Sequence, residues 1–272
     1  MTADRPSPRR ERLSAEEALR IAGGAPGSTG FFFDFDGVLA PIQADPAAVR
    51  PTPGVVERLA DLVRLTARVG VISARPVSFL RDRLGGVPGL SLYGLYGLES
   101  ARNGAEIAVD PEAEPWIPAV RQAVDRAHRE LPSDVLVEDK HLAVALHYRT
   151  APHHAREVAG WAAAVTAELG LAVQEGRMVV ELKPPVARDK GTTIRREIGD
   201  LDGAWYFGDD VSDARAFQAL ADREAERRGF VGVRVAVAND ETGQALKDLA
   251  DFVLDSPAAT PAFLGDVVAR LT

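Results

Sequence analysis

Cysteine is absent from the 272-residue sequence, and methionine occurs only twice. The absence of cysteine excludes disulfide bonds and thiolate metal ligands, and it is consistent with a reducing compartment. Long apolar runs are absent as well, since no stretch approaches the roughly 20 residues that a transmembrane helix needs. The arginines near the N-terminus are not followed by the apolar core of a signal peptide. We therefore expect a cytoplasmic protein with no membrane partner.

Positive charge is in deficit, because 32 Lys and Arg residues stand against 40 Asp and Glu residues, for a net charge of -8. A negative net charge favours solubility and opposes nonspecific binding to nucleic acid. An anionic small substrate remains compatible, because local basic residues can override the global charge. We expect a monomer that binds a small molecule and no nucleic acid.

The most informative stretch runs from Phe31 to Ala40, where three aromatic residues lead directly into Asp34, Asp36 and Gly37. An apolar run of this kind predicts a buried strand of a parallel sheet. The two carboxylates then lie at its C-terminal end, where open α/β sheets bind their ligands. Two acids in this position indicate a metal ligand, a nucleophile, or both.

The pattern along the chain predicts a core domain with an insertion. Residues 1–13 are charged and contain proline, which is typical of a flexible tail. Apolar strands alternate with amphipathic helices over residues 14–104 and 186–272, which predicts an α/β fold with a doubly wound, Rossmann-like parallel sheet. Between them, residues 105–185 read as helix, two strands, helix, two strands, which predicts an inserted α+β cap domain.

A second acidic strand end contains Asp209, Asp210 and Asp213. In a doubly wound sheet these carboxylates can meet Asp34 and Asp36 at one carboxyl edge. Oxygen ligands without cysteine favour a hard cation, most plausibly Mg²⁺. Taken alone, the second acidic loop is equally well explained as a helix start. Together with the Asp-x-Asp-Gly strand end, it predicts a magnesium site.

A Mg²⁺ site with a carboxylate at a strand end indicates phosphoryl transfer, because a carboxylate can attack phosphorus and form an aspartyl-phosphate. That step needs positive charge near the phosphate. Lys190, in the first turn of a predicted helix, can supply it, and Ser73 at the end of the second strand can donate a hydrogen bond. Taken alone, Lys190 could be a solvated helix residue and Ser73 a helix cap.

Four segments of the chain resemble, in order, the four motifs of the haloacid-dehalogenase superfamily. They are Asp34-x-Asp36-Gly37-Val38-Leu39, Ser73, Lys190 and Gly208-Asp209-Asp210-x-x-Asp213. The resemblance implies that Asp34 is the nucleophile and a Mg²⁺ ligand. It implies that Asp36 is the general acid and base and gives its backbone carbonyl to the metal. It further implies that Ser73 and Lys190 hold the phosphoryl group and that Asp209 completes the metal shell. Asp213 would then support the metal shell or bind the metal through water, and the role of Asp210 stays open between these two.

Asp36 would have to protonate a leaving oxygen and then deprotonate a water molecule. A carboxylic acid does this near neutral pH only if its pKa is raised. We expect the nearby Asp34 and an apolar wall that includes Phe35 to raise the pKa of Asp36.

Segments of the insertion narrow the resemblance to the trehalose-6-phosphate phosphatase family. They are Glu138-Asp139-Lys140, His147-Tyr148-Arg149 and the run from Met178 to Pro184. The resemblance departs at Ala74, where the family usually has glycine, and at Tyr96, where many members have histidine. It implies a Mg²⁺-dependent phosphatase that converts trehalose 6-phosphate to trehalose and phosphate.

Charged residues on predicted strands of the insertion match the sugar-binding positions of that family. They are Glu138, Arg149, Arg177 and Glu181. Lys140 and Lys183 are weaker candidates. The alternative is that these residues form the ordinary solvated face of an antiparallel sheet.

Other functions remain open from the sequence. One is a phosphatase of another sugar phosphate, such as sucrose phosphate or a mannosyl-phosphoglycerate, and another is a phosphosugar mutase. A third is a non-catalytic regulatory protein that binds a sugar phosphate. The five histidines show no metal-ligand spacing, and His153-His154 is expected to begin a helix. The stretch from Arg223 to Arg228 is expected to be a solvated loop.

Overall fold

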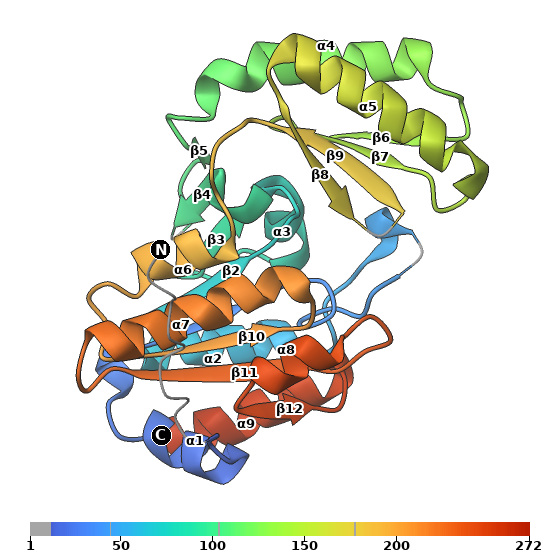
Figure 1. The fold of residues 1–272 in the computed structure, drawn as a ribbon. Coiled ribbons are helices and arrows are strands. Elements are labelled where there is room, and N and C mark those ends of the chain that lie inside the picture. The colour runs from blue at the N-terminus through green and yellow to red at the C-terminus, as the bar shows by residue number, and fades with distance from the viewer. Residues whose placement is uncertain (1–11, 44, 103, 177) are drawn as a thin grey trace, which may run out of the picture. The chain divides into compact units, whose positions relative to one another are not determined.

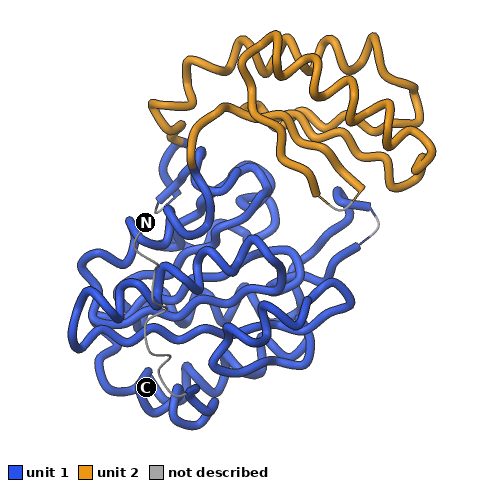
Figure 2. The backbone as a smooth tube through the Cα atoms, in the orientation of Figure 1, with its two compact units in different colours: residues 1–107, 188–272 blue, residues 108–187 orange. Residues whose placement is uncertain are grey.

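The computed structural model describes residues 12–43, 45–102, 104–176 and 178–272. The chain forms two compact units (Figure 2). Unit 1 comprises residues 1–107 and 188–272, and unit 2 comprises residues 108–187. In the part of the chain that is described, every helix is too short or too polar to traverse a bilayer.

Unit 1 is built on a largely parallel sheet with the strand order β12-β11-β10-β1-β2-β3-β4 (Figure 1). The strands are β1 (Thr29–Phe33), β2 (Arg68–Ile72), β3 (Ser91–Gly94), β4 (Glu99–Arg102), β10 (Gly203–Gly208), β11 (Val231–Val237) and β12 (Phe252–Leu254). β4 is antiparallel to β3.

β1 lies at the point where the chain changes its winding direction. From β1 the chain proceeds to β2 and β3 on one side, and β10, β11 and β12 lie on the other. Phe33 at the end of β1 is in parallel register with Phe207 of β10 and Val71 of β2. Residues that follow these strands therefore share one edge at the topological switch point, where ligands of open α/β sheets bind.

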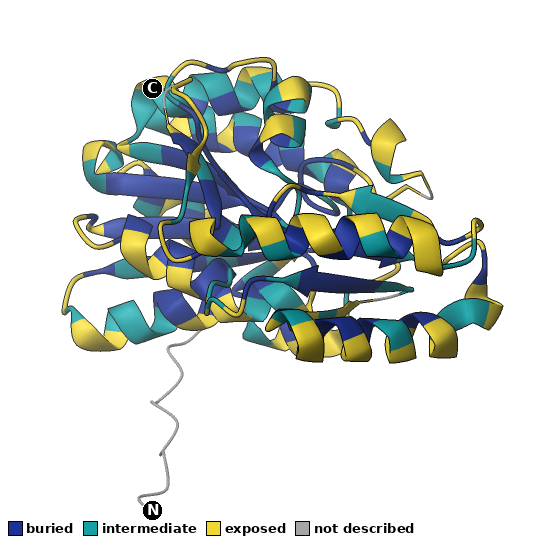
Figure 3. Ribbon diagram, turned by 90° about the horizontal axis from the view of Figure 1, so that it is seen from above, coloured by how far each residue is buried: buried dark blue, intermediate teal, exposed yellow. Residues whose placement is uncertain are grey.

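Helices cover both faces of the sheet, and the alternation of side chains along β1 explains why. Phe31 and Phe33 belong to one core, and Phe32 belongs to the core on the opposite face. The first core packs against α1 (Ala15–Ala22), α2 (Val55–Leu65), α3 (Val77–Leu84) and α9 (Thr260–Leu271). The second packs against α6 (Lys190–Glu197), α7 (Ala214–Glu226) and α8 (Gln244–Leu249). The strands between the helices are buried, as Figure 3 shows.

The prediction of a solvated loop from Arg223 to Arg228 was wrong, because α7 continues to Glu226. Glu224 accepts a hydrogen bond from the backbone N–H of Gly232 at 3.0 Å and lies 3.5 Å from Arg234. These contacts with β11 give the last turn of the helix a partner that a solvated loop would lack.

Unit 2 is an α+β unit with one antiparallel sheet, in the strand order β6-β7-β9-β8. Its strands are β6 (Leu136–Asp139), β7 (Val144–His147), β8 (Ala172–Gly176) and β9 (Val179–Lys183), and the two-residue strand β5 (Ala108–Val109) precedes them. The helices α4 (Ile117–Glu130) and α5 (Ala155–Leu169) pack on one face of the sheet. The predicted fold class, an α/β core with an inserted α+β unit, is confirmed.

Candidate active site

The carboxylate of Asp34 and the ammonium of Lys190 meet at the end of β1. The backbone N–H of Asp34 donates to the carbonyl of Phe207 at 2.9 Å, which extends the sheet pairing by one residue. Asp189 caps α6 and forms a reciprocal capping box with Thr192, so that Lys190 begins the helix. Lys190 Nζ donates to Asp34 Oδ2 at 2.7 Å, although only 2% of the Lys190 side chain is exposed.

Asp213 is the second partner of Lys190 and is completely buried. Its Oδ1 accepts hydrogen bonds from Lys190 Nζ and from the hydroxyl of Tyr206, both at 2.7 Å. Its Oδ2 accepts the backbone N–H groups of Asp209 at 2.9 Å and Asp210 at 3.1 Å. Four donors occupy its lone pairs, so Asp213 holds Lys190 and the acidic loop in place.

Asp209 and Asp210 follow β10 but have different surroundings. Asp209 is buried, and its Oδ2 accepts a hydrogen bond from Asn239 Nδ2 at 2.8 Å. The side chain of Asp210 is half exposed and accepts hydrogen bonds from the backbone N–H and the hydroxyl of Ser212 at 2.8 and 2.6 Å. Asp210 therefore caps the turn before α7, whereas Asp209 lies inside the cluster.

The buried charges of this cluster do not balance. Asp34, Asp209 and Asp213 contribute three carboxylates, and Lys190 contributes one cation. Burial raises the pKa of Asp34 well above its ordinary value, and Lys190 offsets only part of this. Burial, reinforced by Asp213, raises the pKa of Asp209 to about 8. Burial alone would lower the pKa of Lys190, but Asp213 and Asp34 outweigh it and raise that pKa well above its ordinary value.

A divalent cation fits this cluster. Asp34, Asp209 and Asp213 each present a carboxylate oxygen, and these oxygens lie within 4.8 Å of one another. Three buried carboxylates against one ammonium leave two negative charges, which a dication would neutralise. An all-oxygen donor set favours a hard ion such as Mg²⁺ or Ca²⁺ over a transition metal. Because Asp213 already has four donors, Asp34 and Asp209 are the better direct ligands.

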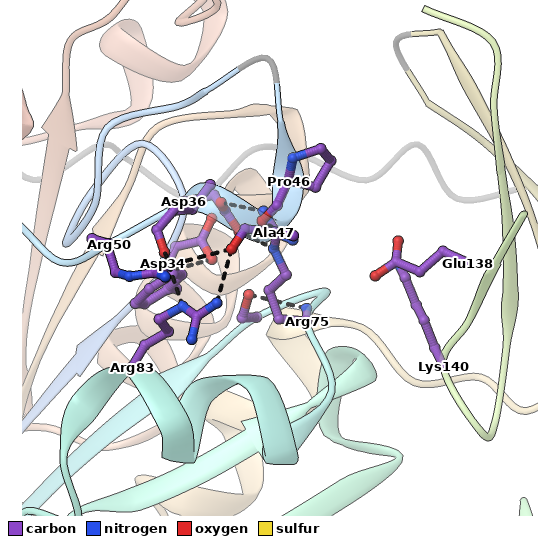
Figure 4. A network of polar contacts seen from close by, with 12 residues as sticks. Asp34, Asp36, Pro46, Ala47, Arg50, Arg75, Arg83, Glu138 and Lys140 are labelled. Atoms are coloured by element: carbon purple, nitrogen blue, oxygen red, sulfur yellow. Dashed lines mark hydrogen bonds and ion pairs between the residues drawn. The ribbon is translucent and has the colours of Figure 1, made fainter. Parts of the chain in front are cut away.

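Asp36 points to a partner that the sequence analysis did not assign (Figure 4). Both of its carboxylate oxygens accept hydrogen bonds from Arg75, from Nε and Nη2, each at 2.8 Å. Arg75 is fixed in turn, because it donates to the carbonyl of Pro46 at 3.0 Å and its guanidinium lies 4.5 Å from the ring centroid of Phe79. The sequence analysis predicted an apolar wall beside Asp36 and did not include this bidentate contact with a cation.

Ser73 directly follows the last residue of β2, and β2 is the strand next to β1. Its backbone N–H donates to the carbonyl of Tyr93 at 3.0 Å, and its Oγ accepts the backbone N–H of Arg75 at 3.2 Å. Only 1% of the residue is exposed. The loop therefore fixes the Ser73 oxygen, while the hydroxyl group can still donate its own hydrogen.

In unit 2, Glu138 and Glu181 lie on the sheet face opposite the helices. Both are in register with Ala145 of β7, which lies between them. His147 Nε2 is 2.8 Å from Glu138 Oε2, and Lys140 Nζ is 3.6 Å from Glu181 Oε1. Two carboxylates separated by a small residue, each with a basic neighbour, form a polar row that can donate to and accept from sugar hydroxyls.

The two predicted arginines of the insertion have different outcomes. Arg149 was predicted to lie on a strand, which was wrong, because β7 ends at His147 and Arg149 is exposed in the turn that follows. The backbone N–H of Tyr148 donates to the carbonyl of Met178 at 3.1 Å, after which the chain leaves the sheet. Arg177 lies outside the described residues.

Sequence reasoning missed three residues that orient the predicted ones. Arg75 binds Asp36, Tyr206 donates to Asp213, and Asn239 donates to Asp209. Asn239 follows the end of β11, so its position after a third strand at the same sheet edge could have identified it. Tyr206 lies inside an apolar strand, where its hydroxyl carries no signal in the sequence.

Gly37 gives a first prediction, because its backbone has φ +78° and a Cβ there would lie 2.1 Å from Asp209 Oδ2. We expect Gly37→Ala to displace Asp209 and to lower the free energy of unfolding by about 1–3 kcal/mol beyond the backbone strain alone. Gly85→Ala is the matched control, since Gly85 has φ +64° and open space where its Cβ would lie. If chemical unfolding shows that both variants lose the same free energy of unfolding, the predicted contact with Asp209 is contradicted.

Known proteins resemble the chain over most of its length. Residues 32–256 match the family model described as trehalose-phosphatase. A curated relative, the trehalose-phosphate phosphatase of Mycobacterium avium, is 37% identical in an alignment of 275 positions that spans 94% of this chain and 67% of the relative. The chain thus spans about two thirds of the length of that relative.

Solved structures share the fold at low sequence identity. The C-terminal domain of Candida albicans trehalose-6-phosphate phosphatase has a TM-score of 0.74 at 20% identity and covers 96% of this chain and 98% of its own. The C-terminal domain of the Candida albicans trehalose synthase regulatory protein has a TM-score of 0.66 at 14% identity, over 94% and 99% of the two chains. Together with the family model and the curated relative, these results confirm the predicted resemblance: the chain belongs to the trehalose-phosphatase family and has the fold of the haloacid-dehalogenase superfamily.

Proposed function

We propose that the chain hydrolyses trehalose 6-phosphate to trehalose and phosphate, with Mg²⁺ as cofactor and an aspartyl-phosphate on Asp34 as intermediate. The observation that carries the proposal is the contact of Lys190 with both Asp34 and Asp213 at 2.7 Å. It combines a buried carboxylate with a fixed cation in a chain that belongs to the trehalose-phosphatase family. The prediction of a phosphatase is confirmed at the level of that family.

In the first step, an oxygen of Asp34 attacks phosphorus, and the bond to the sugar oxygen breaks. Lys190 and Ser73 stabilise the negative charge on the phosphoryl oxygens. Asp36, in its protonated form, donates a proton to the leaving oxygen of trehalose. For this donation, Asp36 must release at least one of its two hydrogen bonds with Arg75, so we propose that substrate binding rearranges this pair.

In the second step, a water molecule attacks the phosphorus of the aspartyl-phosphate, and Asp36 removes its proton. The products are inorganic phosphate and the original carboxylate of Asp34. When Mg²⁺ is bound, it neutralises negative charge that would otherwise oppose the approach of an anionic phosphate. Asp34 and Asp209 would bind Mg²⁺ through their side chains, and Asp36 would bind it through its backbone carbonyl.

The polar row of unit 2, formed by Glu138 and Glu181, is proposed to bind the sugar. Trehalose presents many hydroxyl groups, and carboxylates that accept from them discriminate against sugars that leave the acids unpaired. We further propose that unit 2 acts as a cap and that Arg149 and Arg177 contribute to sugar binding.

A panel of sugar phosphates tests the proposal. Phosphate release is measured with and without Mg²⁺ from trehalose 6-phosphate, sucrose 6-phosphate, glucose 6-phosphate and a mannosyl-phosphoglycerate. We expect the highest kcat/KM for trehalose 6-phosphate and a loss of activity with a chelator. A clear preference for another substrate overturns the assignment of trehalose 6-phosphate. Failure to release phosphate from any of them favours a regulatory role, which the shared fold alone does not exclude.

The raised pKa values predict how Mg²⁺ affects stability at different pH. Because the pKa of Asp209 is about 8 in the folded chain against an ordinary 3.8, the metal-free folded state binds more protons than the unfolded state between these values. Its stability should therefore fall as the pH rises from about 4 to about 8. Mg²⁺ binds the ionised carboxylates, so it should raise the thermal midpoint more at pH 8.5 than at pH 5.5. A larger increase at pH 5.5 would contradict the metal assignment, and NaCl at matched ionic strength is the control.

Glu181→Ala separates sugar binding from chemistry. We expect the variant to raise KM for trehalose 6-phosphate by about tenfold or more while leaving hydrolysis of a small aryl phosphate unchanged, because the small ester has no sugar to bind. Glu175→Ala is the control, since Glu175 lies on β8 of the same sheet but in register with Val180, on the helix-covered face. Equal changes in KM for both substrates would argue against a role in sugar binding.

A further inference from the structure

A second group of metal-binding side chains lies in unit 2, near the start of α5. His153 and His154 form the end of a short turn before this helix, and Asp134 lies in the connection between α4 and β6. His154 Nε2 is 3.2 Å from Asp134 Oδ1, and His153 Nε2 is 3.8 Å from Asp134 Oδ2. The ligand atoms of the three residues all lie within 4.8 Å of one another. One metal ion with bonds of about 2.0–2.2 Å can therefore contact all three after a small adjustment.

Glu157 orients one of the imidazole rings. Its Oε2 lies 2.7 Å from His154 Nδ1, which is the nitrogen on the opposite side of the ring from Asp134. When Nδ1–H donates to a carboxylate, the neutral ring directs the lone pair of Nε2 towards Asp134. Metal-binding histidines in proteins commonly have such a carboxylate on their second nitrogen, because it fixes the tautomer and the ring orientation.

The charges around the cluster also suit a dication. Although the N-terminal end of α5 carries partial positive charge, which opposes a cation at this position, two nearby carboxylates offset it. Asp134 and Glu157 together supply two negative charges, which match the charge of a divalent ion. With 69% of the His153 side chain and 53% of the Asp134 side chain exposed, metal ions reach the cluster from solvent and water can complete the coordination.

From this geometry we propose that Asp134, His153 and His154 bind a divalent transition metal of the Zn²⁺ class, with Glu157 as the orienting residue. Two imidazole nitrogens and one carboxylate favour Zn²⁺, Co²⁺ or Ni²⁺ over Mg²⁺. The donor set thus differs from the all-oxygen cluster at Asp34. The sequence analysis predicted no metal site at the histidines, because Asp134 is distant in sequence from the His153-His154 pair and joins it only in the folded unit.

Metal binding at this position would connect two loops of unit 2. One loop joins α4 to β6, and the other joins β7 to α5. A ligand that binds only the folded state raises its stability, so we assign the site a stabilising role in unit 2 and no part in phosphoryl transfer.

The test is a calorimetric titration of the tag-free full chain with ZnCl₂ at pH 8, in excess Mg²⁺ that is added to compete with Zn²⁺ for the all-oxygen cluster. We expect one binding step with a stoichiometry of one. The variants His153→Ala and Asp134→Asn should each weaken Zn²⁺ binding at least about tenfold, and Glu157→Gln should weaken it about tenfold or more as an orienting residue. Co²⁺ substitution should give a visible absorption spectrum that these variants lose.

The control is His128→Ala, which removes an exposed histidine of α4 outside the cluster and should leave Zn²⁺ affinity unchanged. Equal Zn²⁺ affinity in the parent, His153→Ala and Asp134→Asn would overturn the proposal, as would a parent chain that binds no Zn²⁺. Circular dichroism shows whether each variant is folded. An ion pair between the histidines and Asp134 without a metal function predicts no Zn²⁺ binding, so the titration separates the two interpretations.

Discussion

Asp34→Asn is expected to reduce phosphate release from trehalose 6-phosphate by about 1,000-fold or more, the scale seen when an enzyme loses its nucleophile. An amide oxygen is a far weaker nucleophile than a carboxylate, and it cannot form the aspartyl-phosphate. The fold should persist, because the amide has nearly the same shape as the carboxylate. The variant loses the ion pair with Lys190 but also removes a buried carboxylate whose pKa is raised by burial. We therefore expect the free energy of unfolding to change by less than about 2 kcal/mol.

Asp240→Asn is the matched control for Asp34→Asn. Asp240 is an exposed acid that follows Asn239 at the same edge of the sheet, and its neutralisation should leave kcat within about twofold. Mass spectrometry of acid-quenched parent enzyme should detect phosphate on the peptide that contains Asp34. Phosphate release by Asp34→Asn close to the parent rate would refute the assignment of the nucleophile.

The fold could be predicted because its signals are local. The apolar run from Phe31 to Phe33 identifies a buried strand, and the strand-helix alternation around it requires a parallel sheet. In that topology Asp34 and Asp209 share one edge, as their neighbours Phe33 and Phe207 do in the structure. The motif order predicted that Asp34, Lys190 and Asp213 belong to one site. Lys190 contacts both carboxylates in the structure, but no local sequence pattern specifies these distances.

Other contacts could not be predicted because they depend on residues far apart in sequence. The pairing of Asp36 with Arg75 requires the loop after β2 to reach the loop after β1. The cluster of Asp134 with His153 and His154 requires two separate loops of unit 2 to meet. Arg149 was predicted to lie on a strand, but β7 ends two residues earlier, at His147. Strand ends are set by pairing with a partner, which a single sequence shows poorly.

Lys190→Met is expected to have the largest effect on stability. The substitution removes the ammonium between Asp34 and Asp213 and leaves buried carboxylates without their cation. Breaking a buried ion pair from one side costs about 3–5 kcal/mol. The loss should grow as the pH rises, because protonation of the carboxylates at low pH relieves the uncompensated charge. Chemical unfolding at pH 5.5 and pH 8 measures both the size and the direction of this change.

A second substitution shows whether charge is the cause. In Lys190→Met combined with Asp213→Asn, the amide oxygen can still accept the backbone N–H groups of Asp209 and Asp210, and the amide nitrogen can donate to Tyr206. One buried negative charge is removed, so the double variant should be more stable than Lys190→Met at pH 8 while remaining inactive. Lys247→Met, in the short helix α8, should have no comparable effect. If the double variant is no more stable than Lys190→Met, lost packing rather than unpaired charge explains the destabilisation.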